Sequence, residues 1–427
     1  MSTDTAPAVP AHDAPAHDAP AHGAPAPDAV PSVRTDDARD RYAAAMMQTF
    51  AAPLAVLERG EGCRVWDVDG REYLDFLGGI AVNSLGHAHP VFVEAVTRQA
   101  GALAHVSNYF ATAPQIRLAE KLRELTGAGE AGRVYFANSG TEANEAAFKL
   151  ARLHAAGGRH RILALQNAFH GRTMGALAMT GKAAMRAPFE PMPGGVEHIE
   201  ATVEALEAAL DESVAALIVE PIQGEAGVIP LPDGFLERAR ELTLERGALL
   251  IVDEIQTGIG RTGSWFAYQR AGILPDAITL AKGLGGGFPV GALVTFGEAS
   301  ELLQKGHHGS TFGGNPLATA VAGAVIGEIE RADLLENARD RGAQISDGVL
   351  GLGSSLIAGV RGAGLLLGIA LSEPVAAELA AAALAEGLIV NAPNESSIRL
   401  APPLIITAAD VDEFVARFGR AVQALSA

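Results

Sequence analysis

Short apolar runs alternate with helical stretches between residues 134 and 296, and this alternation constrains the fold more than any other feature. The apolar runs predict buried strands at 134–137, 162–165, 215–219, 248–252, 277–280 and 291–296. Segments 142–154, 202–210 and 235–245 carry apolar residues at helical spacing. Strands that alternate with helices predict an α/β fold, in which helices cover both faces of a largely parallel sheet.

The pattern changes after Gly314 and predicts a smaller α+β domain at 315–427. Its predicted elements are a helix at 316–330, strands at 365–371, 388–391 and 398–400, an Ala-rich helix between the first two strands, and a last helix at 409–425. We expect a large domain at 85–314. Residues 35–84 are expected to pack with the small domain.

Residues 1–34 form a low-complexity segment rich in Ala, Pro, His and Asp. Its few apolar side chains cannot offset the entropy lost on ordering, so the segment is predicted to be a disordered tail. His12, His17 and His22 recur every five residues. Histidines can bind metal, but these three have no fixed geometry, and no metal site is predicted.

Charge and cysteine content argue against several classes of partner and location. The net charge is −18 and no run of Lys or Arg stands out, so nucleic acid and anionic membranes are not expected as partners. No apolar segment approaches the ~20 residues of a spanning helix, and no basic start followed by an apolar stretch marks a secretory signal. Cys63 is the single cysteine and can form no internal disulfide, so a cytoplasmic location is expected.

A phosphate-binding turn is one interpretation of Ala-Asn-Ser-Gly-Thr-Glu-Ala-Asn at 137–144, where a strand is expected to end and a helix to begin. Ser139, Gly140 and Thr141 would expose backbone N–H groups at the helix N-terminus, which suits an anion. An ordinary Ser cap with Glu142 in the first turn explains the same residues. Taken alone, the segment favours the cap.

Two further polar side chains end predicted strands. Asp253 stands at the strand edge where ligands bind in open α/β sheets, and a buried carboxylate there needs a cation such as a protonated pyridine nitrogen. A structural Asp bonded to backbone amides explains this position equally well. Lys282 precedes a glycine loop and is either solvated or a desolvated amine of lowered pKa that can form a Schiff base.

Together the three segments supply a phosphate cradle, an acid for a ring nitrogen and an amine, each at the end of a predicted strand. These are the parts that a pyridoxal 5'-phosphate site needs. A nicotinamide-dependent dehydrogenase is the first alternative, because residues 258–263 match the Gly-x-Gly-x-x-Gly spacing, although they follow Asp253 rather than open a strand–helix unit. The second alternative is a non-catalytic binding module, against which Asp253 and Lys282 both argue.

From about Pro53 onward, the chain resembles the class III aminotransferases, which are pyridoxal-phosphate enzymes of fold type I. The segments that carry the resemblance include N-S-G-T-E-A-N-E-A-A-F-K-L-A-R (138–152), N-A-F-H-G-R-T (167–173), V-E-P-I-Q-G-E-A-G-V (219–228), D-E-I-Q-T-G-I-G-R-T-G (253–263), L-A-K-G-L-G-G-G-F-P-V-G-A (280–292) and H-G-S-T-F-G-G-N-P (308–316). The resemblance implies a large domain built on a mostly parallel sheet, and a homodimer whose active site lies at the subunit interface.

The resemblance also implies a role for each matching residue at the cofactor. Lys282 would carry the cofactor and shuttle the proton, and Asp253 would pair with the pyridine nitrogen. The other implied cofactor contacts are Ser139, Gly140 and Thr141 at the phosphate, Thr311 reaching the phosphate from the partner subunit, Phe169 stacked on the ring, and Gln256 near the ring hydroxyl.

For the substrates, the resemblance implies that Arg172 and Arg399 bind carboxylates and that Glu225 pairs with Arg399 as a gate. Asn108 and Ser310 are the other implied substrate contacts. Two arginines suit substrates with two carboxylates, because a guanidinium binds a carboxylate bidentately. The implied reaction is ping-pong transfer of the δ-amino group of N2-acetylornithine to 2-oxoglutarate, which gives N-acetylglutamate 5-semialdehyde and glutamate in arginine biosynthesis. Ornithine, succinylornithine and 4-aminobutyrate remain alternative donors.

Overall fold

A computed structural model of the protein describes residues 35–155 and 158–426, so the predicted tail at 1–34 lies outside the described residues. The described residues divide after Val56 into two compact units, 35–56 in the first and 57–155 with 158–426 in the second. In the first unit, helix α1 (Thr35–Ala45) buries none of its residues. Within this unit, Arg39 donates hydrogen bonds to the main-chain oxygens of Pro53 and Leu54.

A seven-stranded sheet of order β4-β12-β11-β10-β7-β5-β6 forms the centre of the second unit. Its strands are β4 (Arg133–Ala137), β5 (Arg161–Leu165), β6 (Val196–Ile199), β7 (Val214–Val219), β10 (Leu249–Asp253), β11 (Ala277–Leu280) and β12 (Gly291–Thr295). Within this sheet β12 runs antiparallel to both of its neighbours, while the other pairings are parallel. The predicted α/β fold with a largely parallel sheet is confirmed.

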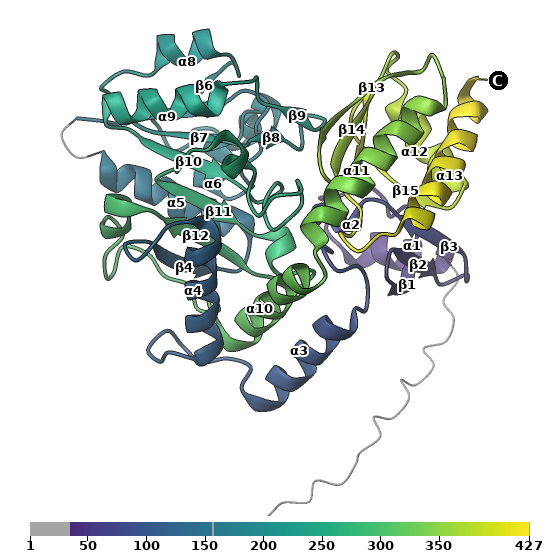
Figure 1. Ribbon diagram of the computed structural model, residues 1–427, viewed down its shortest axis with the longest axis horizontal. Helices are drawn as coiled ribbons and strands as arrows, with labels where there is room; N and C mark the ends of the chain where they lie inside the picture. The colour runs from purple at the N-terminus through teal and green to yellow at the C-terminus, as the bar shows by residue number, and fades with distance from the viewer. Residues whose placement is uncertain (1–34, 156–157, 427) are drawn as a thin grey trace, which may run out of the picture. The chain divides into compact units, whose positions relative to one another are not determined.

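Alternate side chains of the central strands point to opposite faces of the sheet, and helices bury both faces (Figure 1). On one face Ile218 and Ile251 join a cluster with Leu150 of α5 (Gly140–His154). On the other, Leu217 and Leu250 belong to the main core, which also takes in buried residues of α8 (Val203–Ala209), α9 (Phe235–Arg246) and α10 (Pro316–Arg331). The central strands therefore carry continuous apolar runs, which is the pattern that made them recognisable in the sequence.

Further helices complete this part of the chain. They are α2 (Gly78–Ala81), α3 (Pro90–Ala102), α4 (Ala113–Thr126), α6 (Met174–Met179) and α7 (Ala183–Arg186). Helix α10 packs against both α3 and α4, and its buried side chains are mostly Ala, Val and Ile. A short ribbon of β8 (Ile222–Gln223) and β9 (Ile229–Pro230) brackets residues 224–228.

The C-terminal region forms the predicted α+β arrangement. A four-stranded antiparallel sheet has the order β13-β14-β17-β16, with β13 (Ile357–Ala363), β14 (Leu366–Leu371), β16 (Asn391–Asn394) and β17 (Ser397–Leu400). Figure 1 shows helices α11 (Leu334–Gly351), α12 (Ala376–Ala385) and α13 (Ala408–Ser426) gathered beside this sheet. The sequence pattern missed α11, β13 and, apart from Asn391, β16; the strand predicted at 388–391 is β15 (Leu388–Ile389). Gly359 and Gly362 lie within β13, and glycine is depleted in strands.

The first strands of the second unit pair with a strand from near the C-terminus. Strands β1 (Leu57–Glu61), β2 (Arg64–Asp67) and β3 (Glu72–Asp75) form a sheet whose fourth strand is β15 (Leu388–Ile389), parallel to β3. The domain boundaries at 84/85 and 314/315 remain predictions.

Two absences hold for residues 35–155 and 158–426. None of their helices is long and apolar enough to cross a membrane. Nor do three or more His, Cys, Asp or Glu side chains gather there in a group that could hold a metal ion.

Gly364 makes the turn between β13 and β14 at a point of close backbone approach. Its φ is +53°, and a Cβ there would lie 2.5 Å from the main-chain carbon of Thr262. The contact is held from both sides, because Leu365 N donates to Arg261 O at 2.9 Å and Arg261 Nη1 donates to Leu365 O at 3.2 Å.

Replacing Gly364 by Ala is therefore expected to lower the free energy of unfolding by more than about 1 kcal/mol, because an L side chain is strained at this φ and meets backbone. Denaturant unfolding measures the change. Gly351→Ala is the matched control, since its added Cβ meets no atom within 4 Å beyond its chain neighbours and its own helix backbone, and its φ is not positive. Equal stability of the Gly364 variant and the wild type would contradict the account.

Candidate active site

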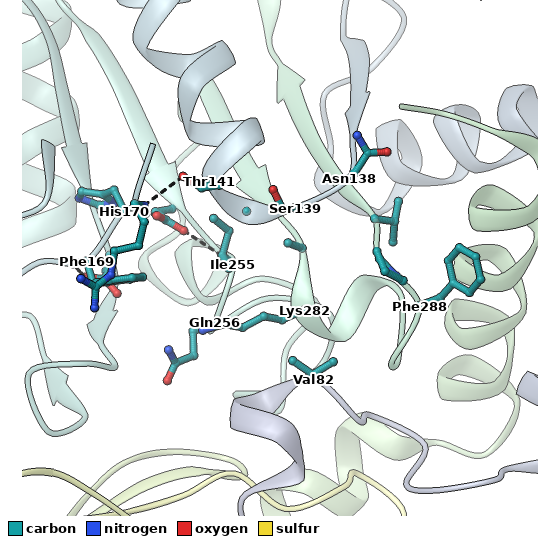
Figure 2. A pocket seen from close by; sticks show the side chains of 18 of the residues that line it. Val82, Asn138, Ser139, Thr141, Phe169, His170, Ile255, Gln256, Lys282 and Phe288 are labelled. Atoms are coloured by element: carbon teal, nitrogen blue, oxygen red, sulfur yellow. Dashed lines mark hydrogen bonds and ion pairs between the residues drawn. The ribbon is translucent and has the colours of Figure 1, made fainter. Parts of the chain in front are cut away.

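A cavity of about 450 Å³ opens at the carboxyl ends of β10 and β11. Eight of the residues predicted for the site line it: Ser139, Gly140, Thr141, Phe169, Arg172, Asp253, Gln256 and Lys282. Figure 2 shows Phe169 and His170 on one side of this cavity, Asn138 and Phe288 on the opposite side, and Lys282 between them. The structure thus gathers residues that are up to 143 positions apart in the chain.

Helix α5 begins at the cavity wall. Ser139 is its N-cap and accepts a hydrogen bond from Glu142 N at 3.3 Å, so the capping interpretation is confirmed. The first backbone N–H groups of a helix have no acceptor within the helix, and Gly140 and Thr141 occupy those positions at the cavity. A cap and an anion site are therefore compatible here, because the cap uses a side chain while an anion would use the amides.

Asp253 ends β10 and is buried, with 3% of its surface exposed. Its Oδ2 accepts from His170 Nδ1 at 2.7 Å and from Asn144 Nδ2 at 2.8 Å, and its Oδ1 accepts from Ile255 N at 3.0 Å. Both interpretations of this carboxylate are therefore partly realised: it bonds to a backbone amide, and it also lines the cavity.

His170 is the side chain that can balance the negative charge of Asp253. Burial disfavours its imidazolium, but the hydrogen bond and the charge of Asp253 outweigh burial, and the pKa of His170 is raised. The Nε2 atom of the same ring is buried with no hydrogen-bond partner among the described residues. The imidazole is therefore oriented by one contact, through Nδ1, and it keeps the carboxylate fixed at the cavity.

Lys282 follows β11 and projects into the cavity (Figure 2). Its φ of +43° is in the left-handed region, which is uncommon for a residue with a side chain and recurs at functional sites. Burial lowers the pKa of its ammonium, and Arg399 adds to this lowering while Glu225, Asp253 and Glu220 oppose it. The side chain is thus a desolvated amine, which is the second of the two interpretations of this position.

Two carboxylates near Asp253 have different surroundings. Glu220 lines the cavity and accepts from Phe169 N at 2.9 Å, and burial raises its pKa to about 7. Glu254 instead faces the core, where it accepts from Tyr268 N at 2.9 Å and from the hydroxyl of Thr257. Burial raises the pKa of Glu254 to about 7 as well. Of the adjacent Asp253 and Glu254, only Asp253 lines the cavity.

Arg172 and Arg399 occupy contrasting environments. Arg172 is exposed where it lines the cavity, with its guanidinium 5.6 Å from the centre of the Phe169 ring. Arg399 is buried, with 1% of its surface exposed, and forms an ion pair with Glu225. Arg399 Nη1 also donates to Gln256 Oε1 at 3.2 Å, and Gln256 connects this pair to the cavity. The charge of Arg399 lowers the pKa of Glu225 although burial opposes it.

The three remaining predicted residues do not line the cavity of their own chain. Asn108 Nδ2 donates to the main-chain oxygens of Ser310, at 3.3 Å, and Gly313, at 3.0 Å. Ser310 Oγ accepts from Asn138 Nδ2 at 3.0 Å, which is its link to a lining residue. Thr311 is exposed.

Sequence reasoning missed His170, Asn144 and Glu220. All three lie inside segments that carry the resemblance, at 167–173, 138–152 and 219–228, but no spacing rule connects them to Asp253. The glycine series 258–263 does not open a helix: added side chains at Gly260 and Gly263 would meet Leu335 and Arg339. The dehydrogenase interpretation is therefore wrong.

The cavity fits a flat, anionic, electrophilic group by the chemistry of its walls. A helix N-terminus at Gly140 and Thr141 favours a phosphate, the Asp253 carboxylate favours a cationic ring atom, and the amine of Lys282 is available as a nucleophile. The aromatic ring of Phe169 forms part of the wall beside His170. These are the contacts that pyridoxal 5'-phosphate requires.

Comparison with known sequences identifies relatives over most of the chain. The sequence model of the family "Aminotransferase class-III" matches residues 46–422. The acetylornithine aminotransferase of Streptomyces coelicolor is 53% identical over 371 residues, covering 86% of this chain and 91% of the relative. The enzyme of the same name from Mycobacterium tuberculosis is 53% identical over 386 residues, covering 90% and 96%.

Solved structures of the same kind are similar in fold. The ornithine aminotransferase of Toxoplasma gondii has a TM-score of 0.87 at 34% identity, covering 92% of this chain and 95% of its own. The N-acetylornithine aminotransferase of Stenotrophomonas maltophilia has a TM-score of 0.78 at 36% identity, covering 91% and 99%.

The buried Glu254 predicts a pH dependence of stability. Its pKa of about 7 in the folded chain lies above the ordinary value of 4.5, so the folded state holds the extra proton between these values. The contribution of Glu254 is then fully present below about pH 4.5 and is lost as the pH rises through about 7. Gln cannot ionise and loses no stability in this way. The free energy of unfolding of Glu254→Gln, minus that of the wild type, is therefore expected to be larger at about pH 8.5 than at about pH 5.5.

Thermal unfolding of the two proteins at both pH values measures this difference, and Glu378→Gln on the exposed face of α12 is the control. A difference between the Glu254 variant and the wild type that does not change with pH would contradict the burial argument.

Proposed function

Because the chain belongs to the class-III aminotransferases, we propose that it transfers the δ-amino group of N2-acetylornithine to 2-oxoglutarate. The products are N-acetylglutamate 5-semialdehyde and glutamate, and the pathway is arginine biosynthesis. The observation that carries the proposal is the convergence of Asp253, Lys282 and the first turn of α5 on one cavity, with the Arg399–Glu225 ion pair beside it. Relatives at 53% identity carry the name acetylornithine aminotransferase, which supports this donor.

The family depends on pyridoxal 5'-phosphate, which when bound supplies an aldehyde for the amine and a ring that accepts the electron pair of the substrate carbon. In our proposal, the amides of Gly140 and Thr141 and the Ser139 turn hold the phosphate. Asp253 pairs with the ring nitrogen, and His170 and Asn144 hold that carboxylate in position. Phe169 would lie against the ring, and Gln256 would reach the ring hydroxyl.

Lys282 performs the covalent and proton-transfer work in this proposal. The desolvation that lowers the pKa of its ammonium increases the fraction of neutral amine at neutral pH. A neutral Nζ would hold the cofactor through its aldehyde carbon, with water as the leaving group. Once the substrate amine has replaced it there, the free amine would take a proton from the substrate carbon and deliver it to the cofactor carbon that carried the aldehyde. The Lys282 backbone is left-handed, and the side chain lines the cavity.

In this proposal, each of the two arginines binds a different carboxylate of the substrate. The exposed guanidinium of Arg172 meets a carboxylate entering the cavity, and Arg399 meets the second carboxylate of glutamate or 2-oxoglutarate. N2-Acetylornithine has only one carboxylate, so Glu225 pairs with Arg399 while this donor is bound. Without that partner a buried guanidinium would be unpaired, which is strongly destabilising. Asn108 and Ser310 are the further substrate contacts that we propose.

A homodimer and a cytoplasmic location are part of the same proposal. Several large apolar side chains near Asn108 and Thr311 are exposed, namely Tyr109, Phe110 and Phe312. Exposed aromatic groups of this kind are typical of protein interfaces. In the dimer, Thr311 reaches the phosphate of the partner's site, which accounts for its position away from the cavity of its own chain. The unpaired thiol of Cys63 fits a reducing compartment.

Removing the Lys282 amine tests the catalytic assignment. Lys282→Ala is expected to lower steady-state turnover of N2-acetylornithine with 2-oxoglutarate by at least ~10² to 10⁴, the usual contribution of proton transfer alone. Lys121→Ala is the control, because it removes a partly exposed surface ion pair that contributes little. Near-normal turnover in a pure Lys282→Ala preparation would overturn the proposed function.

A further inference from the structure

Asn391 forms hydrogen bonds with the edge of the Arg399 guanidinium that faces away from Glu225. The two residues are cross-strand partners of β16 and β17. Asn391 Oδ1 accepts from Arg399 Nε at 3.1 Å and from Nη2 at 2.8 Å. Glu225 and Gln256 both bond to Nη1. One side of the guanidinium is thus held by a neutral amide, and its other end is held by a carboxylate and a second amide.

Asn391 and Glu225 therefore act differently on Arg399: Asn391 holds its position, and Glu225 neutralises its charge. Among the described residues, Glu225 is the acidic side chain within ion-pair distance of Arg399. Asn391 satisfies two N–H donors of the same buried group without adding a negative charge. If Glu225 leaves, Arg399 therefore stays in place and keeps its full charge, with one N–H of Nη1 and the remaining N–H of Nη2 open to a carboxylate, while Gln256 keeps the other N–H of Nη1.

The backbone that carries Glu225 is fastened at four successive carbonyl oxygens. Lys182 Nζ donates to Glu225 O at 2.7 Å, and Asn394 Nδ2 donates to Ala226 O at 2.7 Å. Arg361 donates to the next two oxygens, from Nη2 to Gly227 O at 2.8 Å and from Nε to Val228 O at 3.1 Å.

The backbone conformation of Val228 also indicates that residues 225–228 are held in one conformation. Val228 has a φ of +58°, which a β-branched residue adopts only when its surroundings impose it. With the backbone fixed in this way, the movable part is the Glu225 side chain, which is 25% exposed.

We propose that Asn391 is a specificity-determining positioning residue, which holds Arg399 in one place with an uncharged acceptor so that the same guanidinium serves a monocarboxylate donor and a five-carbon dicarboxylate. The proposal rests on the proposed function, in which one site accepts both substrates in turn. A carboxylate at position 391 would neutralise Arg399 permanently. An alanine there would leave two buried N–H donors unpaired, and the guanidinium would lose its fixed position.

The test uses the holoenzyme and glutarate, an unreactive five-carbon dicarboxylate, as the probe of Arg399. Asn391→Asp is expected to weaken glutarate binding by more than about tenfold, the loss expected for one charged hydrogen-bond partner. The KM for 2-oxoglutarate rises by a similar factor while kcat changes little, and the KM for N2-acetylornithine stays near the wild-type value. Titration calorimetry and the separate half-reactions measure these quantities.

Ser396→Asp is the matched control, because it adds one exposed charge next to β17 without touching Arg399. Its glutarate affinity should equal that of the wild type. A wild-type glutarate affinity in Asn391→Asp, or equal losses with donor and dicarboxylate, would overturn the role of Asn391. If Asn391→Asp fails to bind cofactor or to unfold cooperatively, Asn391→Ala decides by the same criterion: unchanged glutarate affinity overturns the proposal.

A double-mutant cycle with Glu225→Gln separates the position of Arg399 from its charge. With Asn391 intact, Glu225→Gln should strengthen glutarate binding, because Arg399 then has no competing carboxylate. In the Asn391→Asp background the same change should give a much smaller gain, and an equal gain in both backgrounds would contradict the proposal. Glutarate is not turned over, so its binding can be measured whatever the amino donor is. A wild type unable to use N2-acetylornithine would therefore refute the proposed function but not the role of Asn391.

Discussion

The carboxylate of Asp253, buried at the end of β10, is the constraint on which the rest of the site depends. A charged group in this position is costly unless hydrogen-bond donors surround it. Two of those donors, His170 and Asn144, come from other parts of the chain, so the site needs the sheet, α5 and the loop after β5 to be assembled together. One oxygen is tied to His170 and Asn144 and the other to a backbone amide, so the carboxylate has a fixed orientation at the cavity wall.

A second buried charge, the guanidinium of Arg399, obeys the same constraint in the small C-terminal sheet. Asn391 and Gln256 bond to it without changing its charge, whereas Glu225 neutralises it. Both substrates of a ping-pong reaction pass through one site. We propose that Arg399 stays fixed as the cation for a second carboxylate, and that the Glu225 side chain moves away when such a carboxylate is bound. Lys282 lies among these charges, and its pKa is lowered chiefly by burial.

Much of the fold and of the site could be predicted from the sequence, for identifiable reasons. Strands β7, β10 and β11 are buried on both faces, so they carry continuous apolar runs, and the polar residues that follow them mark the ligand edge. The resemblance then supplied Arg399 and Glu225, which no local pattern indicates. His170 and Asn391 could not be found in this way, because each acts by contacting another side chain across the fold, and hydrogen bonds between distant residues leave no periodic signal.

The central claim is that one cavity accepts the amino group of N2-acetylornithine and passes it to 2-oxoglutarate. The most direct measurement follows the absorbance of the bound cofactor in the wild-type holoenzyme during single turnover with N2-acetylornithine. We expect loss of the aldehyde-form absorbance with this donor, its return when 2-oxoglutarate is added, and slower reaction with ornithine, succinylornithine and 4-aminobutyrate. Absorbance that is unchanged by N2-acetylornithine but responds to one of those other donors would contradict it.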